Sequence, residues 1–434
     1  MRLNPTFWLI AILASIGSVS SWGSNPRFNV IVIMADDIGY ECLGAYGSEV
    51  YETPRLDAMA ASGLRFNHCY SQPLCTPSRV KLMTGMSNAR NYVGFSIFPP
   101  DSRSIGHYFQ EAGYKTAVVG KWQLYGAEHY NERFRGKGTL PEDAGFDHHA
   151  LWQVDRLGSR FWAPLLRIDG ENRQFGPDEY GPSIVVDHLL EFMETNREEA
   201  FFAYYPMILV HNPFEPTPLS ESRDEKDKQR NFADMVAMMD RLIGRIVDQV
   251  EALGLSERTY ILFFGDNGTN KNIRSALGGR VVQGGKGAPT DAGTRVPMIA
   301  YGPGVASNEQ GSDALVDFSD ILPTALDLAG LRKPEGLDGV SFAPVLRGQS
   351  RGERETIFVY SNPRPERTEP VLFARDQRWK LYGDGRFYDV ANDVMEERPL
   401  PEQVPLQGAR EARERLRATL ERMPKEGQRL LDLN

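Results

Sequence analysis

Charged and amide side chains stand directly after apolar runs that have the composition of buried β-strands. They are Asp36 and Asp37 after residues 29–34, Lys121 after 114–120, His211 a few residues beyond 201–206, and Asp266 and Asn267 after 259–265. In open α/β sheets, ligands bind beyond the carboxyl ends of the strands. We therefore expect these side chains to gather at one edge of a sheet and to form a functional site there.

The acidic and amide members of this set offer only oxygen atoms to a metal ion. Such hard ligands suit Ca²⁺ or Mg²⁺, whereas a zinc site would need a cluster of Cys and His residues that the sequence lacks. Four oxygen-bearing side chains also leave coordination positions for a nucleophile and a substrate oxygen. The set predicts a divalent-cation site at this edge of the sheet.

The segment 75–79, Cys-Thr-Pro-Ser-Arg, has the composition of a helix start. Thr76 can cap a helix and Pro77 suits its first position, which would place Cys75 at an N-terminus, where unpaired N–H groups favour an anion. Arg79 adds another anion donor one turn later. Such a cysteine is either a thiolate of low pKa or a buried thiol beside a capped helix, and the five residues alone do not decide.

A lysine within a glycine-rich loop is a further anion-binding candidate. Lys286 stands in the sequence Gly-Gly-Lys-Gly at 284–287. The loop is not a P-loop, because the glycine spacing differs and Gly rather than Ser or Thr follows the lysine. It is either an anion site or a plain flexible turn.

The elements that must position these residues alternate between strands and helices. Strands are expected at 29–34, 64–70, 114–120, 201–206, 259–265 and 296–301, and helices at 54–62, 104–112, 232–253 and 320–329. Such alternation indicates an α/β fold with a large, mostly parallel sheet that is flanked by helices. The stretch 125–180 has the composition of a loop, rich in aromatic and basic residues.

The last ninety or so residues have a different pattern. Short strands are expected at 356–360, 371–374, 378–382 and 386–390, with a two-residue hairpin turn at Asp384-Gly385 and a charged helix over 406–422. This pattern predicts a small C-terminal antiparallel sheet plus helix. We expect three segments: a signal peptide at 1–22, a catalytic α/β domain at 23–345 and a C-terminal subdomain at 346–434.

The N-terminus has the pattern of an export signal. Arg2 precedes the 13-residue apolar run 7–19, and small residues follow it. These features predict a secretory signal peptide and a periplasmic or extracellular protein, the alternative being an N-terminal membrane anchor. The formal net charge of the chain is −9. That acidic balance argues against a nucleic-acid partner, which would need a basic surface.

Taken together, the motifs resemble those of the formylglycine-dependent sulfatases, an arylsulfatase-like family of the alkaline phosphatase superfamily. The matches occur in the family's order: Ala-Asp-Asp at 35–37, Cys-Thr-Pro-Ser-Arg at 75–79, Gly-Lys-Trp at 120–122, Val-His-Asn-Pro at 210–213, Gly-Asp-Asn-Gly at 265–268, and Gly-Gly-Lys-Gly with Arg-Val-Pro within 284–297. The resemblance covers nearly the whole chain beyond the signal and implies an alkaline-phosphatase-like fold.

The resemblance implies a role for each site residue. A dedicated maturation enzyme would oxidise Cys75 to formylglycine, whose hydrated form is the nucleophile. Arg79, Lys121 and Lys286 would neutralise the sulfuryl oxygens, and His211 would protonate or steady the leaving alcohol oxygen. Ca²⁺ would be held by Asp36, Asp37, Cys75, Asp266 and Asn267. The implied activity is hydrolysis of sulfate esters by a sulfuric ester hydrolase.

One position departs from the commonest family pattern. After Gly-Lys-Trp most members carry His, and here Gln123 follows. A Gln is not a base, although it can hold the hydrated aldehyde by hydrogen bonds, so the proton acceptor is left open. Gln123, His148 and His149 are the substrate-binding candidates, and a sulfated carbohydrate is the expected substrate.

Other readings of the same residues stay open. Some relatives that share Cys-x-Pro-x-Arg hydrolyse phosphonate or phosphate esters. A catalytically silent, calcium-dependent glycan-binding protein is a further alternative, and Gln123 is the feature in its favour. Cys42 and Cys69 are either a disulfide pair or two buried thiols. The sequence assigns neither the glycan nor an oligomeric state.

Overall fold

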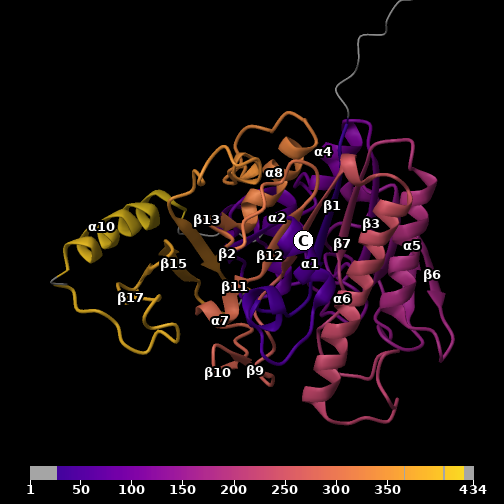
Figure 1. The fold of residues 1–434 in the computed structure, drawn as a ribbon, viewed down its shortest axis with the longest axis horizontal. Helices are drawn as coiled ribbons and strands as arrows, with labels where there is room; N and C mark the ends of the chain where they lie inside the picture. Colours follow the sequence, from indigo (N-terminus) through magenta and orange to yellow (C-terminus); the bar gives the residue numbers. More distant parts are fainter. Residues whose placement is uncertain (1–26, 366, 404–405, 425–434) are drawn as a thin grey trace, which may run out of the picture.

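The computed structural model describes residues 27–365, 367–403 and 406–424, so the expected signal peptide lies outside the described residues. Within them, a central sheet of eleven strands organises the fold (Figure 1). In spatial order the strands are β11 (Arg295–Val296), β2 (Leu64–Tyr70), β12 (Met298–Tyr301), β8 (Thr259–Gly265), β1 (Asn29–Ala35), β7 (Phe201–Pro206), β3 (Lys115–Lys121), β4 (His148–Trp152), β5 (Leu165–Ile168) and β6 (Glu171–Gln174), and β13 (Ser312–Asp317) pairs with β2.

The centre of the sheet is parallel, as the sequence predicts. β1 pairs in parallel with both β7 and β8, and β3 pairs in parallel with β7 and β4. Every residue of β1, β7 and β8 is buried, which explains why their sequences are continuous apolar runs rather than alternating patterns. The antiparallel strands β12, β5 and β6 flank this centre.

Helices cover both faces of the sheet. Ile31 and Ile33 of β1 belong to a core that also contains residues of α1 (Pro54–Ser62), α5 (Gly181–Thr195) and α6 (Lys228–Ala252). Val30 and Val32 point to the opposite face, with residues of α2 (Cys75–Thr84), α4 (Ile105–Glu111) and α8 (Ile321–Leu328). The alternation follows from the period of two in a β-strand.

A four-stranded antiparallel sheet with a helix forms the C-terminal part, at one end of the molecule (Figure 1). Its elements are β14 (Ile357–Ser361), β15 (Val371–Arg375), β16 (Trp379–Tyr382), β17 (Phe387–Asp389) and α10 (Gln407–Arg422). The expected sheet plus helix is confirmed. The hairpin loop is one residue longer than predicted, because Tyr382 N donates to Arg386 O and Gly385 adopts the left-handed conformation, with φ 94°.

Three parts of the fold escaped the sequence prediction. The stretch 125–180, expected to be a loop, contains β4, β5 and β6, and the helix α5 follows it. All four residues of β6 are exposed, so this edge strand lacks an apolar pattern. The hairpin β9 (Arg274–Leu277) and β10 (Arg280–Gln283) also escaped. None of the described helices is long and apolar enough to cross a membrane.

The remaining short helices join these elements. They are the 3₁₀ turns at Tyr40–Cys42, Gly44–Tyr46, Glu142–Ala144, Ser256–Arg258 and Phe318–Asp320, and α3 (Asn88–Asn91), α7 (Asp291–Thr294) and α9 (Ala343–Leu346).

Candidate active site

The carboxyl ends of β1 and β8 bring two pairs of polar residues together. Parallel pairing sets Ala35 beside Gly265, so the residues that follow each strand are neighbours. Asp37 N donates to Asp266 Oδ1 over 2.9 Å, and Asn267 Nδ2 donates to Asp37 Oδ1 over 2.9 Å. The predicted convergence at this edge of the sheet is therefore present.

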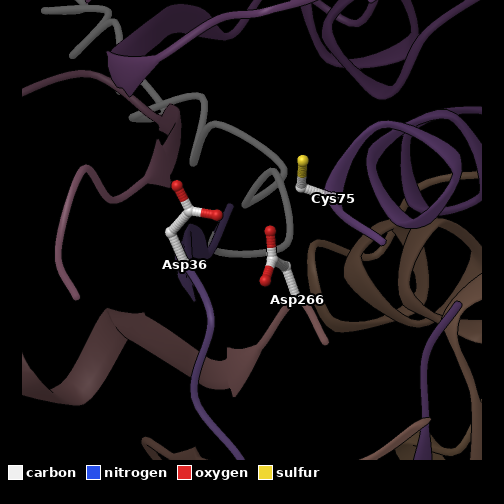
Figure 2. A group of neighbouring side chains, drawn as sticks. All are labelled: Asp36, Cys75 and Asp266. Carbon is white, nitrogen blue, oxygen red and sulfur yellow. The ribbon is translucent and has the colours of Figure 1, made fainter. Parts of the chain in front are cut away.

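Cys75 faces these carboxylates from the first turn of α2. Figure 2 shows the sulfur of Cys75 and the carboxylates of Asp36 and Asp266 directed to one space, and one atom from each lies within 4.8 Å of the others. The helix begins at Cys75 rather than at Pro77, and no side chain caps it. The expected cap by Thr76 is therefore wrong. Pro77 is tolerated in the first turn because the first four N–H groups of a helix have no helical partner.

Buried cations surround the same carboxylates. Lys121 Nζ lies 2.7 Å from Asp36 Oδ2, and Lys286 Nζ lies 2.6 Å from Asp37 Oδ2. Arg79, which is fully buried in α2, places Nη2 3.8 Å from Asp266 Oδ2. His211 Nε2 lies 3.7 Å from Asp37 Oδ2. All the catalytic candidates named from the sequence therefore meet at one site.

Burial and charge act against each other at this site. Burial favours the neutral form of Asp36, but Lys121 and the other nearby cations hold its pKa well below the usual range. Burial, reinforced by the charges of Asp36 and Asp37, raises the pKa of Asp266 well above its usual value. Three carboxylates and three cations are thus held together in a buried, strongly interacting cluster.

Cys75 is a thiol rather than a thiolate in this environment. Burial raises its pKa, although Lys121 and Lys286 oppose that effect. Of the two readings left open by the sequence, the low-pKa thiolate is therefore not supported. Burial also lowers the pKa of His211 to about 4, against the attraction of Asp37 and Asp36.

Three oxygens at the site have no hydrogen-bond partner among the described residues. They are Asp36 Oδ1, Asp266 Oδ2 and Asn267 Oδ1, all of them buried. A buried polar atom without a partner is costly, so such atoms mark places that favour the binding of an ion or a water molecule. Two carboxylates and an amide are hard oxygen donors, so the residues present fit a Ca²⁺ or Mg²⁺ ion.

Gln123 lies beside the thiol. Cys75 Sγ donates to Gln123 Oε1 over 3.3 Å. Gln123 follows β3 with φ 50°, a left-handed conformation, and its N–H donates to the carbonyl of Gln153 over 3.0 Å. The pairing of β3 with β4 continues into these loops and fixes the amide at the site.

The structure does not bring His148 and His149 to this cluster. His148 pairs with Ala117, whereas Lys121 pairs with Trp152, four residues further along both strands. At about 3.3 Å per residue, three or four residues separate the histidines from the site end by about 10–13 Å. His148 Nδ1 lies 2.9 Å from Asp169 Oδ2 instead. The histidines therefore lie toward the other edge of the sheet.

Arg160 reaches the site and was not predicted. Its Nη1 lies 3.1 Å from His211 Nδ1, and its guanidinium stacks over the ring of Trp152, 4.0 Å from the centroid. The signal was weak but present, since Arg160 precedes Phe161 and Trp162 in a stretch rich in basic and aromatic residues.

The remaining cysteines do not pair. Cys42 and Cys69 are both free and buried, and Cys42 Sγ lies 3.4 Å from Thr269 Oγ1. Of the two alternatives left by the sequence, the structure has the two buried thiols.

Comparisons with known proteins agree with this arrangement. Residues 28–331 match the Sulfatase family, and residues 289–424 match the family described as N-sulphoglucosamine sulphohydrolase, C-terminal. The chain is 29% identical over 390 residues to Arylsulfatase A of Homo sapiens, covering 82% of this chain and 74% of that protein. It is 29% identical over 392 residues to N-acetylgalactosamine-6-sulfatase of Mus musculus, covering 81% of this chain and 72% of that protein.

A solved structure shares the fold. It is a protein in complex with its substrate D-glucosamine-2-N,6-O-disulfate, with a TM-score of 0.72, 20% sequence identity, and coverage of 93% of this chain and 100% of that one. With a family match over most of the chain and curated sulfatases among its relatives, the chain belongs to the sulfatase family, enzymes that hydrolyse sulfate esters.

Proposed function

We propose that this protein is an exported sulfatase that acts on sulfated carbohydrate through a formylglycine made from Cys75. One observation carries the proposal: Cys75 lies at the first turn of α2, near unpaired carboxylate oxygens, the buried cations Arg79 and Lys121, and the half-buried Lys286. A cysteine thiol of raised pKa is a poor nucleophile in itself. Its position among such groups is better explained by modification than by thiol chemistry.

Five residues would hold the cation. They are Asp36, Asp37, Asp266, Asn267 and the modified residue 75, and the proposed ion is Ca²⁺. The hydrated aldehyde would supply the nucleophilic oxygen, and the cation would supply positive charge for the sulfuryl group. Apart from that, the chain's own side chains orient and neutralise the ester.

Arg79, Lys121 and Lys286 would bind the sulfuryl oxygens. Arg79 Nε and Nη2 are buried without hydrogen-bond partners, so their N–H groups remain available to an anion. Lys121 pairs with Asp36 and Lys286 pairs with Asp37. A bound cation would compete with the two lysines for these carboxylates and so leave the ammonium groups available to the sulfuryl oxygens. Fixed donors in a water-poor site stabilise charge that develops in the transition state.

His211 would protonate the alcohol oxygen that leaves when the ester is cleaved. Its Nε2 faces the carboxylate of Asp37, and its Nδ1 lies 2.6 Å from the carbonyl oxygen of Asn212. That carbonyl fixes the ring by accepting the Nδ1 hydrogen, because it has no hydrogen to donate. An anionic ester beside the ring favours the protonated form, from which Nε2 can pass a proton to the alcohol oxygen.

The substrate class rests on similarity. N-acetylgalactosamine-6-sulfatase is among the relatives, and a protein of the same fold binds a disulfated glucosamine as its substrate. We extend this to a sulfated carbohydrate for the present chain. The proposal also includes a partner, a maturation enzyme that generates the formylglycine. It includes export directed by a signal peptide at residues 1–22, and a catalytic α/β domain at 23–345 followed by a C-terminal subdomain at 346–434.

The test is the mass of the peptide that contains residue 75. Protein matured in its native host is digested, and the peptide is expected to carry formylglycine in place of cysteine. The Cys75→Ala variant is the control and should have no sulfatase activity. An unmodified cysteine in fully active protein would contradict the proposal. Paired kinetics on aryl sulfate and aryl phosphate esters would show whether sulfate is the preferred ester.

A further inference from the structure

We propose that Arg160 forms an anion-binding subsite, which accepts a second negatively charged group of the substrate next to the ester that is cleaved. The inference rests on the proposed function and narrows its substrate class. The second group is a carboxylate or a further sulfate on the same or the adjoining sugar.

The position of Arg160 relative to His211 indicates which part of the substrate it meets. The imidazole directs Nε2 to Asp37 at 3.7 Å and Nδ1 to Arg160 Nη1 at 3.1 Å. The ring therefore lies between Arg160 and the carboxylate of Asp37, although the charges of Asp36 and Asp37 still act on the guanidinium. Because His211 serves the leaving alcohol oxygen, a group just beyond it meets the sugar rather than the sulfur.

The guanidinium of Arg160 forms no ion pair with a carboxylate of the described residues. Nδ1 of His211 carries its hydrogen toward the carbonyl of Asn212 at 2.6 Å, so it cannot also accept from Arg160. Burial lowers the pKa of Arg160, against the attraction of Asp36 and Asp37 and, more weakly, of Glu215. A bound anion would offset that cost of burial.

The guanidinium is also held in place before any substrate binds. It stacks on Trp152, whose indole Nε1 donates to Gly158 O over 2.9 Å. Trp162, two residues after Arg160, donates from Nε1 to Pro216 O over 2.8 Å and ties this loop to the segment that follows His211. A donor fixed in advance loses little entropy on binding. Its planar fork suits a carboxylate or a sulfate equally.

The experiment compares substrates that differ only in the second anion. Wild type and Arg160→Gln are assayed on a neutral sugar monosulfate, on the same sugar with a second sulfate, and on a sulfated uronic acid. We expect kcat/KM of the variant to fall ten- to one-hundred-fold on the doubly anionic substrate and less than about three-fold on the monosulfate. A loss of kcat/KM on the disulfated sugar identifies the second anion as a sulfate, and a loss on the sulfated uronic acid identifies it as a carboxylate. Arg156→Gln, an exposed arginine of the same loop, is the matched control.

Binding separates this inference from the proposed function. Cys75→Ala protein, with and without Arg160→Gln, is titrated calorimetrically with the same sugars, which needs neither formylglycine nor turnover. If Arg160→Gln weakens binding of the doubly anionic sugar only, the result supports the subsite even if the protein does not hydrolyse sulfate esters. If Arg160→Gln weakens binding of all the sugars equally, the subsite proposal is overturned. Glu215→Gln removes a nearby negative charge and should tighten binding of the doubly anionic sugar two- to five-fold, and no gain there counts against the subsite.

Discussion

The thiol of Cys75 donates to the side-chain oxygen of Gln123 at 3.3 Å, although 48 residues separate them in the chain. Cys75 comes from the first turn of α2 and Gln123 from the end of β3. The amide has no proton to gain or lose near neutral pH. Gln123 therefore holds residue 75 in orientation, and the proton acceptor of the reaction is a different group.

Replacing Gln123 by Ala should lower kcat about five-fold, because residue 75 loses a hydrogen bond that orients it, which is worth about 1 kcal/mol. Gln153→Ala is a matched control. Gln153 also has a left-handed backbone, with φ 56°, but its amide donates to the hydroxyl of Tyr130 rather than to Cys75. Steady-state kinetics at saturating substrate measure the effect, and an equal loss in both variants would argue against an orienting role.

Removal of divalent cations should destabilise the protein as well as inactivate it. Asp36 Oδ1, Asp266 Oδ2 and Asn267 Oδ1 are buried without partners, and without an ion their repulsion opposes folding. Ca²⁺ at about one hundred times its Kd should add about 2.7 kcal/mol to the free energy of unfolding. Thermal melts with chelator and with added Ca²⁺ or Mg²⁺ measure this gain.

Asp36→Asn is the variant that tests the metal ligands directly. It should abolish most of the Ca²⁺-dependent rise in Tm, because the amide that replaces the carboxylate brings no negative charge to the ion. Asp248→Asn, at an exposed carboxylate that pairs only with Arg55 among the described residues, should keep the full rise. If Asp36→Asn responds to Ca²⁺ as wild type does, the ion binds elsewhere.

Sequence reasoning succeeded where local chemistry determines structure. The continuous apolar runs of β1, β7 and β8 could only be buried strands, and parallel pairing then forced Asp36 and Asp266 together. Lys121 was found for the same reason, since it stands where a strand ends, whereas Lys286 was found from the glycine-rich loop that carries it.

It failed where tertiary packing overrides local pattern. His148 was placed at the site because of its residue type, but the register of β4 against β3 carries it toward the opposite edge. Arg160 was missed because its role depends on stacking with Trp152 and on a loop whose path no periodicity encodes. The register of two paired strands and the path of a loop depend on contacts between residues far apart in the chain, so local sequence patterns do not predict them.

The C-terminal sheet should support catalysis by anchoring the loop that carries Lys286. Buried Lys380 of β16 donates from Nζ to the carbonyl of Pro289, three residues after Lys286, and its charge pairs with Glu396 Oε1 at 2.7 Å. Lys380→Met should lower Tm, because Glu396 is left buried without its cation. It should also lower kcat about ten-fold at temperatures where the protein is folded.

Arg354→Met separates these two effects. Arg354 is half-buried and donates from Nε to Asp320 Oδ2 over 2.7 Å, away from the Lys286 loop. Its loss should therefore lower Tm by a similar amount and leave kcat within about two-fold of wild type. Melting curves and kinetics on the same preparations measure both quantities. A parallel fall of kcat in both variants would show that general destabilisation, rather than loop anchoring, explains the loss.

Acid should destabilise the protein partly through His68. This side chain of β2 lies 3.1 Å from the hydroxyl of Tyr70, and burial, with Arg295 and Arg375 adding to it, lowers its pKa to about 4 from an ordinary 6.5. Between these values the unfolded chain binds a proton that the folded protein does not, so the free energy of unfolding falls as pH decreases from about 6.5 to 4, by at most about 3 kcal/mol. His68→Gln removes the titrating group and should flatten this part of the profile. Urea unfolding of both proteins at pH 7 and pH 4.5 gives the comparison, and an identical loss of stability on acidification in the two would assign the effect to other groups.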